Sequence, residues 1–338
     1  MPFIPEILKY DSLSIVGLEK NTGKTECLNY ILGRLPLDSI KIAVTSIGID
    51  GEDKDQVTGS AKPNIILREG VYFSTSENYY RQKNLSAELV DVSDEESSLG
   101  RIVTGKVIRE GKILLAGPSS TISLHHWMNK MDEFGVNLKI VDGALNRLSL
   151  ASPAISKAMI LSTGAAYSAE MNVLVNKTKY MVDLINLSEE EDLLIKSMEE
   201  YENGIWGMTM EGRILNISKK SSLILRDMNS DFLKQCKIIY VAGALTDSFL
   251  NILINYPDIK GKELIVDDFT KIFTSEQAYR LFIKRGGIIK VMKKSKLIAV
   301  CVNPTAPNGY ILDSDILCRK LEEAIKLPVY DIVKNNYC

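Results

Sequence analysis

The sequence predicts an α/β protein built on a mainly parallel sheet with helices on both faces. Short apolar runs of strand length alternate with helical patterns along the chain, which is how parallel strands are connected. The 338 residues are 45% hydrophobic and 25% charged, as in ordinary globular proteins. At about 150 residues per domain, we expect two domains, 1–200 and 205–338.

Charge and cysteine usage narrow the class of protein. A formal net charge of −2 favours neither nucleic acid nor an anionic membrane as partner. The five cysteines are scattered, without a Cys-x-x-Cys pair, so they favour reduced thiols in a cytoplasm. No signal-peptide layout opens the chain, and no apolar run approaches the roughly 20 residues of a membrane span. We expect a soluble, cytoplasmic protein.

The most informative stretch is the loop 17–25. It follows an apolar run, closes on Gly23, Lys24 and Thr25, and leads into a helical pattern at 24–35. This order is typical of a P-loop NTPase, because loop N–H groups and the helix dipole attract phosphate. Lys24 is expected to reach the β- and γ-phosphates of ATP, and the Thr25 hydroxyl to ligate Mg²⁺.

The spacing departs from the usual pattern. Five residues, instead of four, separate Gly17 from Gly23, and Leu18 stands where the first Gly is expected. The longer spacing resembles the loop of dethiobiotin synthetases. The alternative is an ordinary strand–turn–helix corner with Lys24 in solvent. The residues expected to bind the nucleotide are Gly17, Lys20, Asn21, Thr22, Gly23, Lys24, Thr25 and Glu26.

Two acidic residues are candidates for the metal and the chemistry. Asp142 follows the strand pattern at 138–141, and Asp50 follows the one at 39–47. Both would emerge at the carboxyl edge, where open α/β sheets bind ligands. We expect Asp142 to hold Mg²⁺ with Thr25, and Asp50 to complete the shell or orient the attacking water. An Asp-Gly turn at Asp142 and a solvated Asp50 are the alternatives.

A β-rich insertion is expected between the first strands and the rest of the sheet. Runs at 65–67 and 71–73 suggest one hairpin, and 102–115 suggests another that turns at 110–111. The charged residues 93–97 between them are expected to form an exposed loop.

The second half repeats the strand–helix rhythm and predicts a smaller α/β domain. A capping box at 188–191 is expected to open a helix that ends near 201, at the domain boundary. Strands are expected at 238–242, 264–266, 288–291 and 297–302, and helices at 248–255, 275–285 and 313–326. Asn176-Lys177 lacks the Asp of the guanine-reading pattern, since Lys179 stands there, so ATP is the default nucleotide.

Several segments, in order, resemble the KamB family of lysine 5,6-aminomutase reactivase subunits. They are residues 14–25, 45–52, 62–63, the Gly70 hairpin, 116–119, 141–147, 161–165 and 302–304. The resemblance implies a chaperone-like ATPase of lysine degradation. Its partners would be the mutase, which uses adenosylcobalamin and pyridoxal phosphate, and a larger MutS-like ATPase. Together they would use ATP to expel damaged cobalamin. The resemblance assigns no residue roles.

Three readings remain open from the sequence. A reactivase would use loops such as 48–56 as a switch that the γ-phosphate holds and hydrolysis releases. A ligase or kinase of dethiobiotin synthetase type would turn over ATP with a small carboxylate or amine. A scaffold would have lost hydrolysis and would only dock the partner ATPase.

Overall fold

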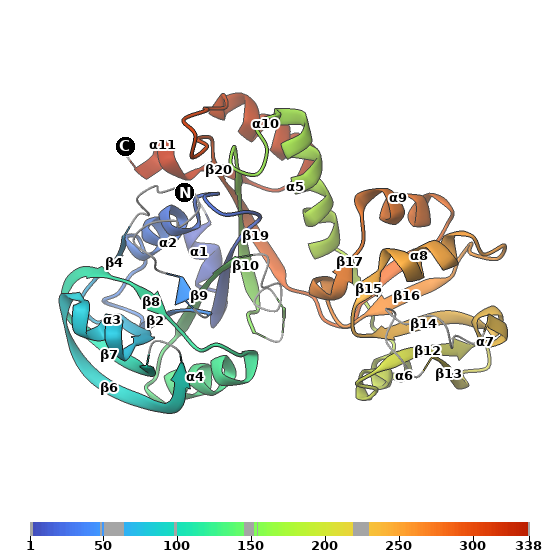
Figure 1. Ribbon diagram of the computed structural model, residues 1–338, viewed down its shortest axis with the longest axis horizontal. Helices are drawn as coiled ribbons and strands as arrows, with labels where there is room; N and C mark the ends of the chain where they lie inside the picture. The colour runs from blue at the N-terminus through green and yellow to red at the C-terminus, as the bar shows by residue number, and fades with distance from the viewer. Residues whose placement is uncertain are drawn as a thin grey trace. The chain divides into compact units, whose positions relative to one another are not determined.

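The computed structural model describes residues 3–47, 49–50, 64–97, 100–144, 152–153, 155–218 and 230–336. The chain forms two compact units (Figure 1). The main unit comprises 1–179 and 295–338, and the inserted unit comprises 180–294. The sequence placed the division near residue 200 and gave the whole second half to one domain. The structure instead returns the last 44 residues, 295–338, to the main unit.

The main unit is built on a sheet of ten strands among the described residues. Seven of them run parallel in the order β20-β19-β10-β1-β9-β2-β5. Their bounds are β1 Ser12–Gly17, β2 Ile42–Ser46, β5 Tyr72–Ser76, β9 Leu138–Ala144, β10 Ala158–Gly164, β19 Lys296–Asn303 and β20 Val329–Asp331. The model is therefore α/β with a mixed, mostly parallel sheet, and β1 lies at its centre.

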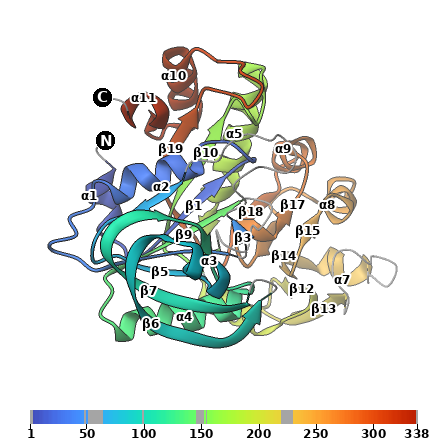
Figure 2. The same cartoon turned by 60° about the vertical axis from the view of Figure 1, so that its left-hand side comes forward.

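An antiparallel extension follows β5, and here two expected hairpins differ from the structure. β4 (Ile65–Leu67) and β5 both pair with β7 (Gly100–Ile113), and not with each other. β7 is continuous through 110–111, and it pairs along its length with β6 (Asn84–Ser97). Figure 2 shows β6 and β7 as one long curved hairpin. The expected loop at 93–97 is the end of β6, because an edge strand tolerates charged side chains.

Helices cover both faces of the main sheet, since side chains alternate along each strand. On one face Leu138 and Ile140 of β9 pack in a cluster that includes α2. On the other, Val141 packs against Trp127 and Met131 of α4. The helices of this unit are α1 Ile4–Ile7, α2 Lys24–Leu32, α3 Glu77–Gln82, α4 Thr121–Glu133, α5 Met171–Ile185, which continues into the inserted unit, α10 Ser314–Ile325 and α11 Ile332–Asn336.

The inserted unit has its own six-stranded sheet in the order β11-β18-β16-β14-β12-β13. The first four strands are parallel, and β12 and β13 extend them antiparallel. The bounds are β11 Ser188–Glu189, β12 Gly204–Thr209, β13 Ile214–Ser218, β14 Cys236–Ala242, β16 Glu263–Val266 and β18 Ile288–Val291. The strands expected at 238–242, 264–266 and 288–291 are confirmed, whereas the one expected at 297–302 is β19 of the main unit.

Short helices complete the inserted unit. α8 and α9 contact each other and bury Phe249, Leu253 and Phe282. Their bounds, with the minor elements, are α6 Leu193–Lys196, α7 Ser230–Gln235, α8 Asp247–Ile254, α9 Glu276–Lys284, β15 Leu245–Thr246, β17 Ile272–Phe273 and the 3₁₀ helices η2 Ser197–Glu200 and η3 Phe269–Lys271. The expected capping box is wrong: Ser188 pairs with Lys290 in the sheet, and Asp192 caps α6 instead.

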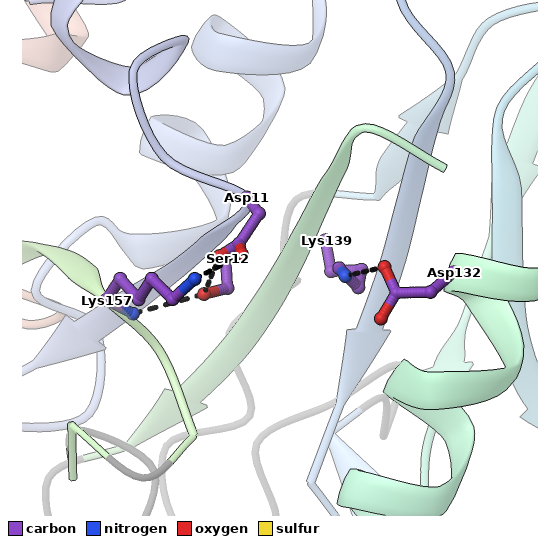
Figure 3. A network of polar contacts seen from close by, with 5 residues as sticks. All are labelled: Asp11, Ser12, Asp132, Lys139 and Lys157. Carbon is purple, nitrogen blue, oxygen red and sulfur yellow. Dashed lines mark hydrogen bonds and ion pairs between the residues drawn. The ribbon is translucent and has the colours of Figure 1, made fainter. Parts of the chain in front are cut away.

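Charged pairs hold the amino-terminal ends of the central strands (Figure 3). The Lys157 Nζ lies 2.5 Å from the Asp11 carboxylate, and the Ser12 hydroxyl donates to the same side chain at 2.8 Å. Lys139 of β9 is buried and pairs with Asp132 of α4. Burial favours a higher pKa for Asp11, but the hydrogen bonds and charge of Lys157, with the Ser12 bond, outweigh it and lower that pKa.

We find no helix in the described part of the chain with both the length and the apolar character that a membrane crossing needs.

Candidate functional site

The 17–25 loop connects β1 to α2 at the carboxyl end of the central strand. Gly17 is the last residue of β1, and Lys24 is the first of α2. Two residues between them have left-handed backbone, Asn21 with φ 62° and Gly23 with φ 91°. Gly and Asn tolerate this conformation better than other residues, so the residue types fit the turn. Residues 18–23 between the strand and the helix form bends and a turn.

The start of α2 has no capping side chain, because Gly23 is its N-cap. By contrast, Ser120 caps α4, Thr246 caps α8, Ser275 caps α9 and Asp313 caps α10, each through a side-chain oxygen. The N–H groups of a first helical turn have no acceptor inside the helix. An anion can therefore take the place that a capping oxygen takes in the other helices.

Glycine at position 17 fits the close packing of side chains within the loop. A Cβ at Gly17 would lie 2.7 Å from the Lys24 Cγ and Cδ atoms and 2.7 Å from the Thr22 hydroxyl oxygen. The Lys24 side chain thus folds back over β1. The Thr22 hydroxyl in turn donates to the Glu19 carbonyl at 2.8 Å. Leu18, at the usual Gly position, is buried, and its N–H continues the ladder to Ser162 at 2.9 Å.

Two neighbouring strands brace the loop from the same side. The Ser162 hydroxyl of β10 donates to the Thr22 carbonyl at 2.5 Å. The Asn303 amide of β19 donates to the Asn21 carbonyl at 3.2 Å. Neither residue is among those predicted from the sequence to form the site. Each is a polar residue at the end of an apolar strand, which is a usable signal, but assigning 303 to the second domain separated it from the loop.

The predicted ligands are distributed over α2 and the adjoining strands. Thr25 and Glu26 lie in the first turn of α2 and are half-buried, while Lys20 in the loop is exposed. Asp142 is buried, and it lies within β9, two residues before that strand ends. The expectation that Asp142 follows the strand is therefore wrong, because β9 ends three residues later than the predicted 138–141 pattern. Asp142 pairs in register with Ile15 of β1 and Ser46 of β2.

Alternation along β9 places Asp142 on the sheet face that α2 covers. Leu138 and Ile140 pack in the cluster with α2, and residues i, i+2 and i+4 of a strand share one face. Asp142 thus shares a face with the helix that carries Thr25. A hydroxyl and a carboxylate are oxygen donors of the kind Mg²⁺ prefers, and Mg²⁺ commonly uses one or two carboxylates together with phosphate oxygens.

Other arrangements for a metal are not found in the described residues, where no three His, Cys, Asp or Glu gather.

Asp50 lies in β3 (Ile49–Asp50), which pairs antiparallel with β8 (Leu115–Ala116) and sets Asp50 opposite Leu115. Its side chain is outside the described residues, as are Gly48 and residues 51–63, so the role expected for Asp50 and the 48–56 switch stay predictions. Residues 145–147 of the resemblance also lie outside them.

A pair of cysteines packs behind the loop. The Sγ atoms of Cys27 on α2 and Cys301 on β19 are 3.6 Å apart, and both residues are buried. Burial, with Cys27 as neighbour, raises the pKa of Cys301 well above that of an ordinary thiol. The contact between the two buried sulfur atoms joins α2 to the returning strand.

Comparison with protein-family models, with curated proteins and with solved structures gave no match to this chain.

Proposed function

We propose that this chain binds ATP with Mg²⁺ at the 17–25 loop and hydrolyses it. The observation that supports this most is the loop itself, where a central parallel strand passes through two left-handed residues into a helix whose N-cap is Gly23 and whose first residue is Lys24. Loop N–H groups and a lysine on a helix N-terminus form a site suited to polyphosphate.

Each predicted site residue would have a separate role in binding and hydrolysing ATP. Lys24 would donate to the β- and γ-phosphates and stabilise charge as the terminal phosphoryl group leaves. Thr25 and Asp142 would hold Mg²⁺, which when bound would neutralise phosphate charge. The backbone between Asn21 and Lys24 would orient the chain of phosphates. Asp50 would position the attacking water.

We further propose that the ATPase serves the reactivation of lysine 5,6-aminomutase, as the resemblance implies. In this role the chain acts with a MutS-like ATPase and uses ATP to release damaged cobalamin from the mutase. The five-residue spacing between Gly17 and Gly23 favours one other candidate, a ligase or kinase of dethiobiotin synthetase type.

Steady-state ATP hydrolysis separates these functions. The chain is assayed alone, with the mutase and the partner ATPase, and with small carboxylates or amines, and Lys24→Ala serves as the inactive control. Stimulation by the proteins, lost in Lys24→Ala, is expected for a reactivase. Stimulation by a small molecule alone would favour the ligase or kinase. If the chain binds no ATP under any of these conditions, the scaffold is the function that remains.

A further inference from the structure

We propose that Asn303 is a positioning residue of the nucleotide site, holding the 17–25 loop in its phosphate-binding form. This inference depends on the proposed function, because it assigns a role within the same site. Asn303 ends β19, the strand by which the chain returns from the inserted unit to the main sheet. It therefore comes from a part of the sequence about 280 residues from the loop that it contacts.

Both ends of the Asn303 carboxamide are used. Its Nδ2 donates to the Asn21 carbonyl at 3.2 Å, and its Oδ1 accepts from the Thr305 N–H at 3.0 Å. These two bonds fix which end of the amide faces the loop. The Asn303 Cβ also lies 3.0 Å from where a Cβ of Gly23 would be. Asn303 thus bonds to Asn21 and leaves little room for a side chain at position 23, the two left-handed positions of the loop.

The backbone of Asn303 is fixed as firmly as its side chain. Its carbonyl accepts from the Ala165 N–H at 3.0 Å. A Cβ at Gly164 would lie 2.1 Å from the same carbonyl oxygen, so β10 and β19 approach each other closely there. Because the strand ends are tightly packed, the Asn303 amide is presented to the loop by a rigid support.

The bonds to the loop carbonyls determine where its N–H groups point. In a trans peptide the carbonyl and the following N–H point in opposite directions. Asn303 holds the Asn21 carbonyl, and Ser162 holds the Thr22 carbonyl. The N–H groups of Thr22 and Gly23 therefore point away from β10 and β19. Successive N–H groups turned to one side by left-handed residues form a concave anion site.

This arrangement requires support because left-handed backbone at a residue with a side chain is costly. Asn21 is one of two non-glycine residues with positive φ in the described chain. Such conformations persist where the surroundings over-determine them. Without the Asn303 bond, the loop would sample other conformations, and ATP would have to restore the bound one. The affinity for ATP would then fall in proportion to the fraction of molecules whose loop is no longer in the phosphate-binding conformation.

The test measures ATP affinity by calorimetry for wild type, Asn303→Ala and Asn303→Asp. Asn303→Ala should bind ATP threefold to tenfold more weakly, the size expected for one neutral hydrogen bond. Asn303→Asp keeps the acceptor for Thr305 but turns an oxygen toward the Asn21 carbonyl, so it should bind more than tenfold more weakly. The control Asn308→Ala, an exposed Asn in the same segment, should bind as wild type does.

A second readout separates positioning from general stability. Hydrogen exchange of the Thr22 and Gly23 amides in the ATP-free protein should accelerate in Asn303→Ala, while amides of β1 remain protected. If wild type binds ATP and Asn303→Ala binds equally tightly with unchanged exchange, the inference is wrong and the proposed function stands. If wild type binds no ATP, the proposed function and the inference both fail.

Discussion

The two units each contain a parallel strand that leads through a glycine loop into a helix, but the helix starts differ in charge. In the main unit β1 leads to α2, with Gly23 at φ 91° and Lys24 as the first residue. In the inserted unit β14 leads to α8, with Gly243 at φ 119°. There Thr246 caps the helix, and Asp247 is its first residue.

The acidic residues near the two helix starts also differ in their surroundings. Asp142 of β9 lies on the face covered by α2, the helix that carries Thr25, and the proposed function assigns Mg²⁺ to these two residues. Asp267 follows β16 and accepts a hydrogen bond from the Tyr240 hydroxyl at 2.5 Å. The Asp247 carboxylate likewise accepts from the Ser275 N–H at 2.7 Å. The start of α8 thus has a capping side chain, and Asp267 and Asp247 accept hydrogen bonds within the inserted unit, whereas α2 starts at Gly23 without a side-chain cap and has a lysine as its first residue.

The largest effect on ATP binding is expected when Lys24, the first residue of α2, is replaced by aspartate, the first residue of α8. Lys24→Asp places a carboxylate where the phosphates would bind, so both attraction and geometry are lost. We expect ATP affinity to fall by about 100-fold or more, since bonds to charged groups contribute about 1.5–3 kcal/mol each. Calorimetric titration measures the change. The same charge reversal at exposed Lys284 of the inserted unit should leave affinity as it is, and equal losses in both variants would contradict the comparison.

Replacing the first residue of α8, Asp247, should lower the stability of the inserted unit without changing ATP binding. Asp247→Ala removes the acceptor for the Ser275 N–H and hydroxyl, and we expect the inserted unit to lose about 1–3 kcal/mol. Trp206 is the tryptophan of this unit, and Trp127 that of the main unit. Urea unfolding followed by Trp206 fluorescence, in a Trp127→Phe background, reports the loss. A weaker ATP affinity in Asp247→Ala would show that the helix starts are not independent.

A smaller effect is expected at Asp267, with a defined dependence on pH. Burial raises the pKa of Asp267 above its ordinary value of 3.8, although the Tyr240 hydrogen bond opposes this. The folded state therefore holds the proton more tightly, and stability falls as pH rises from 3.8 to the raised value. Asp267→Asn keeps an acceptor for Tyr240. It should stabilise the inserted unit at pH 7 and leave its stability unchanged in acid; a gain that is independent of pH would refute the assignment.

The smallest effect is expected at Asp11, and its sign is opposite. The pKa of Asp11 is lowered, so its contribution is present above 3.8 and is lost as pH falls through the lower folded value. Asp11→Asn should destabilise the main unit at pH 7 by less than about 1 kcal/mol, because exposed ion pairs contribute little. Urea unfolding followed by Trp127 in a Trp206→Phe background measures this, and a larger loss in acid than at pH 7 would contradict the account.

Local patterns predicted the elements well, because strand and helix periodicities are set by neighbouring residues. The strand expected at 264–266 is β16, and the helix expected at 275–285 is α9. The loop 17–25 was found because its glycines and its lysine are contiguous. The 93–97 segment was misread, since charged residues suit the exposed edge of a strand as well as a loop.

Long-range placement could not be read from the same patterns. The run at 297–302 has the composition of a buried strand in either unit, and nothing in it states which sheet it joins. Asn303 reaches the 17–25 loop because this run forms β19 of the main sheet. Ser162 was missed for a related reason, because its role depends on the Thr22 carbonyl, which carries no signal in the side-chain sequence.

Amide NMR of the perdeuterated chain with ¹⁵N-labelled glycine tests the central claim most directly. Addition of ATP and Mg²⁺ is predicted to shift the resonances of Gly17 and Gly23 in a saturable manner and to leave Gly243 in place. Shifts at Gly243 in place of the two loop glycines, or no shift at millimolar ATP, would contradict the claim that the main unit's helix start holds the nucleotide.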